Sequence, residues 1–321
     1  MQKILFLILF NSFLLSDIFN VPSDQYPTIQ SGIDVAQDSD TVLVAQGLYY
    51  ENLKITRSIT LASHAIFDDL TDWNIFNEIF WQWEVTNNNI NNTIIDGSSA
   101  TDDFGSAILI YAEEDECITP EIIGFTIQNG LGTTVCRDGE DCAVDTEFLH
   151  ILGGGILFDI SNPKIEYNKF VNNGSTDIRA GGATYGTAID EDWDYNQTPT
   201  DYFDFSSRDM RCEIEEFNLS NNYYNGNDAL YGNSFANKGF EDTFDMSESI
   251  FDVANCNLEE VSPVWVYVEP EATLDLEEIE SNLCAFSGPN AYVDSNIEQE
   301  CIEDGCGTFN NPFKTITWAL Q

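Results

Sequence analysis

The feature that most constrains the fold is a repeated pair of short segments. At three places, an apolar alternation that contains phenylalanine is followed by asparagine: Phe125/Asn129, Phe170/Asn172 and Phe217/Asn221. A strand that starts on glycine precedes each of these places, at Gly105, Gly153 and Gly181 respectively. In a coil of parallel strands, equivalent positions of successive turns align, so apolar side chains form a continuous core. Asparagine at a bend bonds its copy in the next turn and tolerates left-handed backbone.

This pattern predicts a solenoid of short parallel strands, with Asn129, Asn172 and Asn221 lining one bend. The alternative is a β-sandwich with ordinary Asn-Gly turns, which does not require asparagine at a constant phase.

The segment after residue 20 predicts a cap and then strands. Residues 28–36 place Ile29, Ile33 and Ala36 on one helical face, and Pro27 stands near the start, where its missing N–H costs nothing. Brief strands follow at 41–45, 53–56 and 58–61, separated by polar turns. This order favours a capped coil of strands over a βαβ unit.

Two stretches, 21–34 and 40–52, resemble the opening of right-handed parallel β-helix proteins, and 153–156 and 162–168 resemble their later turns. That group includes pectate-lyase-like enzymes, periplasmic carbohydrate-binding proteins and many secreted bacterial proteins of unknown activity. The resemblance spans roughly residues 21–255. It implies an all-β fold, a right-handed parallel β-helix (solenoid) with a short N-terminal capping helix. It assigns no activity, because the fold hosts several.

Four segments are expected along the chain. Lys3 precedes an apolar run at 4–15 that is too short to span a bilayer, so 1–20 reads as a signal peptide, with a buried N-terminal strand as the alternative. The β-helix domain is expected at 21–260, and terminal strands with an acidic linker at 261–291. Residues 315–320 match the helix at 28–33, which predicts the start of a second, truncated β-helix unit at 292–321, with more chain beyond it in the full-length protein.

The net charge of the chain limits the kinds of partner that it can bind. The chain has 56 Asp and Glu against 11 Lys and Arg, a net charge of -45. Such a surface repels nucleic acid and anionic lipid headgroups and favours cations. No segment is long and apolar enough for a membrane span. A polysaccharide or cell-surface glycan is the expected partner, on the strength of the aromatic insertions described below.

Eight cysteines favour an oxidising, secreted, extracellular or cell-surface setting. Short spacings suggest Cys136 with Cys142 and Cys301 with Cys306, and weaker arguments suggest Cys256 with Cys284 and Cys117 with Cys212. The chain lacks Cys-x-x-Cys, and its two histidines, His64 and His150, are isolated, which argues against structural zinc.

A calcium-dependent lyase would need carboxylates that hold the metal and a nearby basic side chain that removes the proton. The candidate bases are Arg179, Arg208 and Arg211, and the nearby carboxylates are Asp190, Asp192 and Asp194. The alternative is a solvated acidic loop. The Asp-His, Gly-His-Gly and Leu-Gly-Arg-Pro-Trp motifs of the related enzymes are absent, which lowers the expectation of catalysis.

Calcium is the one cofactor expected, since hard oxygen donors gather on loops. A loop between Cys136 and Cys142 offers a second set of ligands: Asp138, Glu140, Asp141 and Asp145. EF-hand spacing is missing, and acidic turns stapled by cystine are the alternative.

Aromatic residues crowd two insertions, one with Trp73, Trp81 and Trp83, and one with Trp193, Tyr195 and Tyr202. Exposed rings stack on sugar faces, so either insertion could form a carbohydrate platform. The alternative is that the rings pack onto the flank of the solenoid.

These observations predict a secreted or cell-surface β-helix protein that acts in binding or adhesion, or as a carbohydrate-binding module without catalysis. The alternative is a calcium-dependent polysaccharide lyase, or another polysaccharide-active enzyme, on acidic glycans. The charge argues against the alternative, because an acidic substrate would meet an acidic surface unless calcium bridged them.

Overall fold

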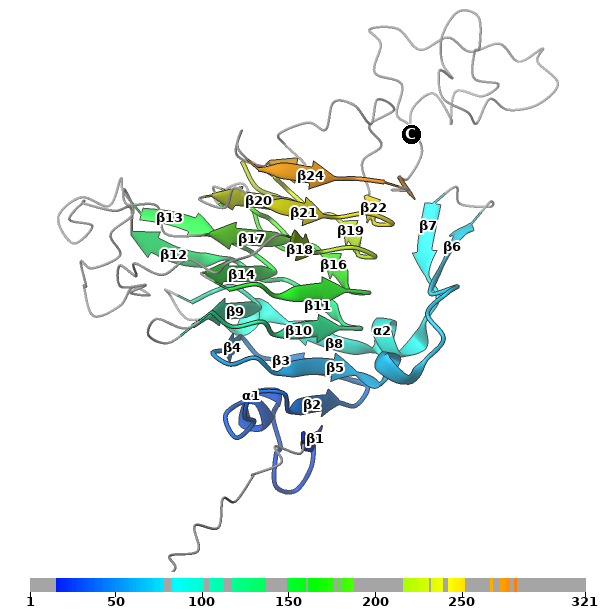
Figure 1. Cartoon of the computed structure of the whole chain (residues 1–321), viewed down its shortest axis with the longest axis vertical. Coiled ribbons are helices and arrows are strands. Elements are labelled where there is room, and N and C mark those ends of the chain that lie inside the picture. The colour runs from blue at the N-terminus through cyan, green and yellow to red at the C-terminus, as the bar shows by residue number, and fades with distance from the viewer. Residues whose placement is uncertain are drawn as a thin grey trace, which may run out of the picture.

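The computed structural model describes the chain in these ranges: 16–77, 82–100, 104–112, 117–136, 149–159, 161–175, 178, 180–187, 216–230, 232–238, 242–251, 266–267, 272–277 and 280–281. Within them, short strands wind into three stacked parallel sheets, the right-handed parallel β-helix that the sequence predicts (Figure 1). The β-sandwich alternative is wrong, because neighbouring strands in all three sheets run parallel.

Sheet A begins at the N-terminal end with β1 (Ile18–Val21), β2 (Thr41–Val44), β5 (Thr60–Ser63), β10 (Glu121–Ile123) and β15 (Lys164–Glu166). Three further strands contact this stack through β15 and extend the same face: β18 (Glu216–Asn218), β21 (Thr243–Asp245) and β24 (Thr273–Asp275).

Sheet B contains β3 (Gly47–Tyr50), β8 (Thr93–Asp96), β11 (Thr126–Gln128), β16 (Lys169–Val171), β19 (Tyr223–Asn225), β22 (Ile250–Phe251) and β25 (Glu280–Ser281). Sheet C contains β4 (Leu53–Ile55), β9 (Ile108–Tyr111), β14 (Ile156–Asp159), β17 (Thr184–Thr187), β20 (Phe235–Lys238) and β23 (Val266–Tyr267). Parallel pairing thus continues past residue 260, where β23, β24 and β25 each pair with a strand of an earlier coil.

The N-terminal end is covered by α1 (Ile29–Ile33), shorter than the predicted 28–36. Thr28 and Ser31 form a capping box, and the Glu51 carboxylate accepts the N–H groups of Ile29 and Gln30 at 3.0 Å each. The predicted apolar face is confirmed, since Ile29, Ile33 and Ala36 are all buried. This face seals the first coil of the core from water.

The apolar alternations are each split into two strands by a bend. In the segment 121–130, β10 ends at Ile123 and β11 starts at Thr126, and Gly124 between them has a φ of +84°. The bend leads from sheet A to sheet B, so the two halves of one alternation belong to different faces. Only glycine adopts this φ without strain, and a Cβ there would meet Ser63 Oγ at 2.6 Å.

Left-handed residues occupy two bends and not one, which corrects the expectation for the asparagines. Asn129 and Asn172 have φ values of +57° and +53° and follow the strands of sheet B. Asn221, at +55°, lies instead at the bend between sheets A and B. The left-handed backbone itself is confirmed at all three positions.

Hydrogen bonding between turns belongs to the residue after each left-handed position. At the first bend the buried column is Phe125, Asn168, Asn222 and Ser249: the N–H of Phe125 donates to Asn168 Oδ1, and that of Asn168 to Asn222 Oδ1. At the second bend, the N–H of Gly130 donates to Asn173 Oδ1 and that of Asn173 to Asn227 Oδ1. Each ladder satisfies backbone groups that the bends leave without sheet partners.

Aromatic rings stack inside the later coils. Phe170, Tyr224 and Phe251 occupy one column of sheet B, with centroids 5.2 Å apart at each step. Phe217 and Phe244 stack at 4.6 Å on the opposite wall. The column in sheet B continues the smaller Ile95 and Ile127 of the earlier coils, so the core is continuous along the axis.

Two hairpins project from the coils. The insertion 64–92 contains η1 (His64–Phe67), the antiparallel strands β6 (Asn74–Asn77) and β7 (Gln82–Val85), and α2 (Asn88–Asn92), and it lies along one side of the solenoid (Figure 1). The second hairpin joins β12 (Thr133–Cys136) to β13 (Leu149–Leu152). No helix among the described residues is long and apolar enough to cross a membrane.

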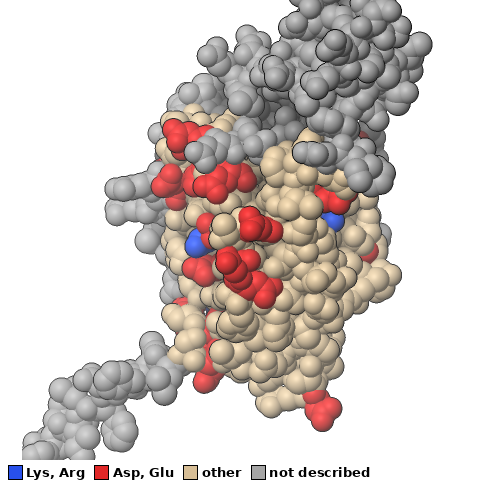
Figure 2. Space-filling view, turned by 90° about the vertical axis from the view of Figure 1, so that its right-hand side faces the viewer, with Lys and Arg blue, Asp and Glu red and all other residues tan. Residues whose placement is uncertain are grey.

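Acidic side chains gather on the half of the solenoid away from α1 on the face shown in Figure 2. Sheet A contributes the aligned pair Asp245 and Asp275. Lys164 forms an ion pair with Glu166 at 2.8 Å on the same sheet. The capping end carries less of the negative charge in this view.

Asp96 is a buried carboxylate that links two coils. It accepts the N–H of Ser98 at 3.0 Å and the side-chain amides of Gln128 and Asn129 at 2.8 Å each. Burial, the largest single influence, raises its pKa, but the hydrogen bonds together outweigh it and hold the pKa of Asp96 below its ordinary value. The charged form is therefore favoured in the folded protein.

We expect Asp96→Asn to lower stability by about 1–2 kcal/mol at pH 7, because the two amides lose a charged acceptor. The folded pKa lies below the unfolded value of about 3.9, so this stabilisation is complete above pH 4 and is lost as the pH falls through the folded pKa. Thermal melts of both proteins from pH 7 to pH 3 measure it. A difference in Tm that did not shrink on acidification would contradict the assignment.

Candidate functional site

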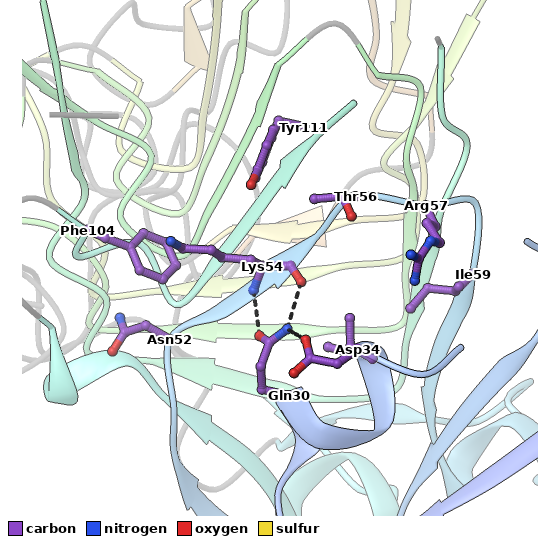
Figure 3. A pocket seen from close by; sticks show the side chains of 10 residues that line it. Gln30, Asp34, Asn52, Lys54, Thr56, Arg57, Ile59, Phe104 and Tyr111 are labelled. Atoms are coloured by element: carbon purple, nitrogen blue, oxygen red, sulfur yellow. Dashed lines mark hydrogen bonds between the residues drawn. The ribbon is translucent and has the colours of Figure 1, made fainter. Parts of the chain in front are cut away.

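A cavity of about 670 Å³ lies where α1 packs beside β4, at the N-terminal end of sheet C (Figure 3). Residues from three parts of the chain line it: α1 and its C-terminal end, the segment 52–59, and the segment 104–111, which includes β9. They are Gln30, Ile33, Asp34, Asn52, Lys54, Thr56, Arg57, Ile59, Phe104 and Tyr111.

Strand alternation places Lys54 in this cavity. Leu53 and Ile55 are fully buried in the core, so Lys54 between them points outward. Lys54 is in register with Leu109 of β9, and that column continues through Leu157, Tyr185 and Ala236. Val135 and Leu152 of the β12–β13 hairpin cover the apolar part of the column. In the first coil, the position in this column is occupied by the charged Lys54, which lies beside the cavity.

The Lys54 side chain extends to the Phe104 ring, with Nζ 5.0 Å from the ring centroid (Figure 3). Gln30 ties the helix to this strand, because its Oε1 accepts the N–H of Lys54 at 2.8 Å and its Nε2 donates to the Lys54 carbonyl at 3.1 Å. The same Nε2 donates to Asp34 Oδ1 at 2.8 Å. These bonds fix the floor of the cavity.

Arg57 lies on the other side and donates from Nη1 to the Ala36 carbonyl at 2.9 Å. Together with Lys54 it makes up two of the four Lys and Arg residues whose side chains the structure describes, the others being Lys164 and Lys169. In a chain with a net charge of -45, two cations at one cavity are a local reversal of sign.

Asn52 is held between coils, since its Nδ2 donates to the carbonyls of Gly97 and Ser106 at 3.0 and 2.9 Å. Its Oδ1 is buried and makes no hydrogen bond to the described part of the protein. With Thr56 and Tyr111, it gives the cavity hydroxyl and carboxamide groups as well as charges.

This arrangement can hold a ligand through several kinds of contact. Rings beside cations and carboxamides can hold a polar ligand that has one apolar face. Asp34 is the single carboxylate among the ten lining residues, whereas glycoside hydrolysis uses two.

The aromatic insertion 64–92 packs on the solenoid. Trp73 is 4% exposed and meets Tyr167 edge-on at 5.7 Å, within a cluster that also holds Ile90 and Tyr223. The expectation that Trp73 belongs to an exposed platform is therefore wrong, and the alternative of rings packed on the flank is confirmed for it. Trp83 is half-buried and contacts Phe76 at 5.6 Å.

Most other predicted site residues lie outside the described ranges: Arg179, Arg208, Arg211, Asp138, Glu140, Asp141, Asp145, Asp190, Asp192, Asp194, Trp81, Trp193, Tyr195 and Tyr202. The described residues contain no group of three or more His, Cys, Asp or Glu that could hold a metal ion. Cys117 is disulfide-bonded, and Cys212, its predicted partner, is outside the described part.

Sequence reasoning missed the cavity. The alternation Leu53-Lys54-Ile55 was a signal that a cation faces outward. No local signal links this strand to Phe104 and Tyr111, because that contact depends on the length of the coil between them.

No family model matches the chain, and no curated protein matches it in sequence. Among solved structures it is similar to pectin methylesterase PemA from Erwinia chrysanthemi, with 10% identity and a TM-score of 0.29. It is also similar to a pectin methylesterase in complex with hexasaccharide VII, with 10% identity and a TM-score of 0.31, and to a mutant in complex with hexasaccharide IV, with 11% and 0.29. Each match covers 83% of this chain and 89% of the other. At these values, no activity, ligand or residue role is carried over to this chain.

Proposed function

We propose that this β-helix protein binds a carbohydrate chain in the cavity between α1, β4 and Tyr111, without transforming it. The observation that carries the proposal is the convergence of two rings, two cations and two carboxamides around about 670 Å³. That volume is within the range of small-molecule sites, which runs from about 300 to 1,000 Å³.

Each class of side chain has a role in holding a sugar. The rings of Phe104 and Tyr111 offer apolar surface for the C–H face of a pyranose. The Thr56 hydroxyl can bond a sugar hydroxyl, and Asn52 shapes the wall beside it. Lys54 and Arg57 add donors for hydroxyl groups or for an acidic substituent.

The lining supports binding without catalysis, because Asp34 has no second carboxylate beside it among the lining residues. Asp34 also accepts a hydrogen bond from Gln30, which suits a positioning role. The protein would then act in adhesion or as a carbohydrate-binding module.

Export to an extracellular or cell-surface location is part of the proposal. It is supported by the apolar run at 4–15 after Lys3 and by the eight cysteines, of which Cys117 is disulfide-bonded. The mass of the mature N-terminus would test it, since retention of Met1 or Gln2 in exported protein would contradict a cleaved signal peptide.

Binding is tested by titration calorimetry against neutral and acidic oligosaccharides. We expect Lys54→Gln to weaken the Kd of the bound sugar about tenfold, because a charged donor contributes on the order of 1.5 kcal/mol. Lys164→Gln is the matched control, because it removes the same charge from a strand of sheet A far from the cavity lining. Equal effects of the two variants, or no binding of any sugar, would contradict the proposal.

The lyase alternative predicts a different result. Incubation with uronate polymers would give unsaturated product only when calcium is present, and Arg208→Ala would abolish it. That outcome would replace the binding function with catalysis.

A further inference from the structure

Lys169 lies on the outer side of β16, beneath the insertion 64–92. Its Nζ donates to Asn91 Oδ1 at 3.1 Å, and the two residues are 78 positions apart in the chain. Asn91 belongs to α2 of the insertion, whereas Lys169 belongs to the solenoid. The contact therefore joins two parts of the fold that no strand pairing connects within the described residues.

The amine is partly withdrawn from water. Burial lowers the pKa of Lys169, and only the Glu84 carboxylate acts in the opposite direction. The Tyr223 ring lies 5.9 Å from Nζ, and Trp73, Ile90 and Tyr223 form one buried cluster at the same place. A desolvated lysine has a larger neutral fraction, and the neutral amine is the nucleophile.

The acceptor is held in position. Asn91 Nδ2 donates to the Val85 carbonyl at 2.6 Å, so the carboxamide plane is fixed while its oxygen faces the amine. A nucleophile and a carbonyl thus meet beside one apolar cluster.

We propose that Lys169 and Asn91 form an intramolecular isopeptide bond. The lone pair of the neutral Lys169 amine attacks Asn91 Cγ, a C–N bond forms, and the Cγ–Nδ2 bond breaks. Nδ2 leaves as ammonia with its own two hydrogens and one from the amine, so the products are one secondary amide and one ammonia. The step needs no oxidant and no co-reactant.

This bond would fasten the aromatic insertion to the solenoid. Closing a loop of 78 residues restricts the unfolded chain in the way a disulfide does, without depending on a redox environment. The inference concerns the opposite flank from the sugar cavity and does not rest on the proposed function.

Mass spectrometry of the reduced, full-length protein tests the proposal. We expect an intact mass lower than that of the sequence by one ammonia, and a branched peptide that contains both Asn91 and Lys169 after proteolysis. Succinimides at Asn129-Gly130 or Asn173-Gly174 would also lose ammonia, but hydroxylamine cleaves them and leaves an amide intact.

Two variants separate the chemistry from folding. Lys169→Arg keeps the positive charge but removes the nucleophile, so the full mass should return. Lys164→Arg is the matched control and should still form the bond. The native protein alone can overturn the proposal. It would do so if proteolysis gave Asn91 and Lys169 in separate, unbranched peptides, or if the loss of ammonia mapped to other residues.

Discussion

Asn222→Ala is expected to destabilise the protein by about 3 kcal/mol or more, because one side chain satisfies backbone groups of two neighbouring coils. Asn222 is fully buried, and its Oδ1 accepts the N–H of Asn168 at 2.9 Å. Its Nδ2 donates to the carbonyls of Ile165 and Leu219 at 2.6 and 2.7 Å. Each buried group that loses its partner costs about 1–3 kcal/mol, and alanine replaces none of the bonds.

Denaturant unfolding measures this loss, and the corresponding fall in Tm is about 4–5 °C for a chain of 321 residues. Asn92→Ala is the control, since Asn92 is exposed and its side chain, within the described part of the chain, donates only to the Asn88 carbonyl of its own helix. We expect the control to change stability by less than about 0.5 kcal/mol. Equal losses in the two variants would show that the ladder does not stabilise the coil.

The asparagine pattern predicted the coil, but not which asparagines adopt left-handed backbone and which form the buried hydrogen bonds between coils. Asn221 and Asn222 are adjacent and chemically identical, yet one adopts left-handed backbone and the other is buried in the ladder. A bend turns one of them outward and the next inward, and the sequence does not show where the bend falls. For the same reason Phe125 and Phe170 appeared equivalent, although Phe170 is in register with Ile127.

The candidate site was less predictable than the fold. The apolar face of α1 follows from local periodicity, and Ile29 and Ile33 are buried as expected. The cavity instead depends on Lys54 and Phe104, whose contact spans a whole coil. The exposed position expected for Trp73 was wrong for a related reason. An insertion rich in aromatic residues has the same sequence pattern whether its rings face solvent or cover Tyr167 and Tyr223.

Phe244→Ala is expected to cost about 3–5 kcal/mol, the range for deleting a buried ring. The Phe244 ring is fully buried, stacks on Phe217 at 4.6 Å and meets Phe235 at 4.8 Å. Its column continues to Leu274 in the next strand of the same face. Alanine leaves a cavity between coils that the rigid strand register cannot close.

The position of Phe244 along the solenoid determines which strands lose stability in the Phe244→Ala variant. A solenoid is stabilised by contacts between neighbouring coils, so a defect near one end first releases the coils beyond it. Hydrogen exchange should therefore show lost protection in β21, β22 and β24, while β2, β5 and β10 near α1 keep theirs. Phe67→Ala is the control, because this ring is 67% exposed and its removal should leave exchange unchanged. Uniform loss of protection along all three sheets would instead mean that the described coils unfold as one cooperative unit, and the nearest-neighbour account of this β-helix would be wrong.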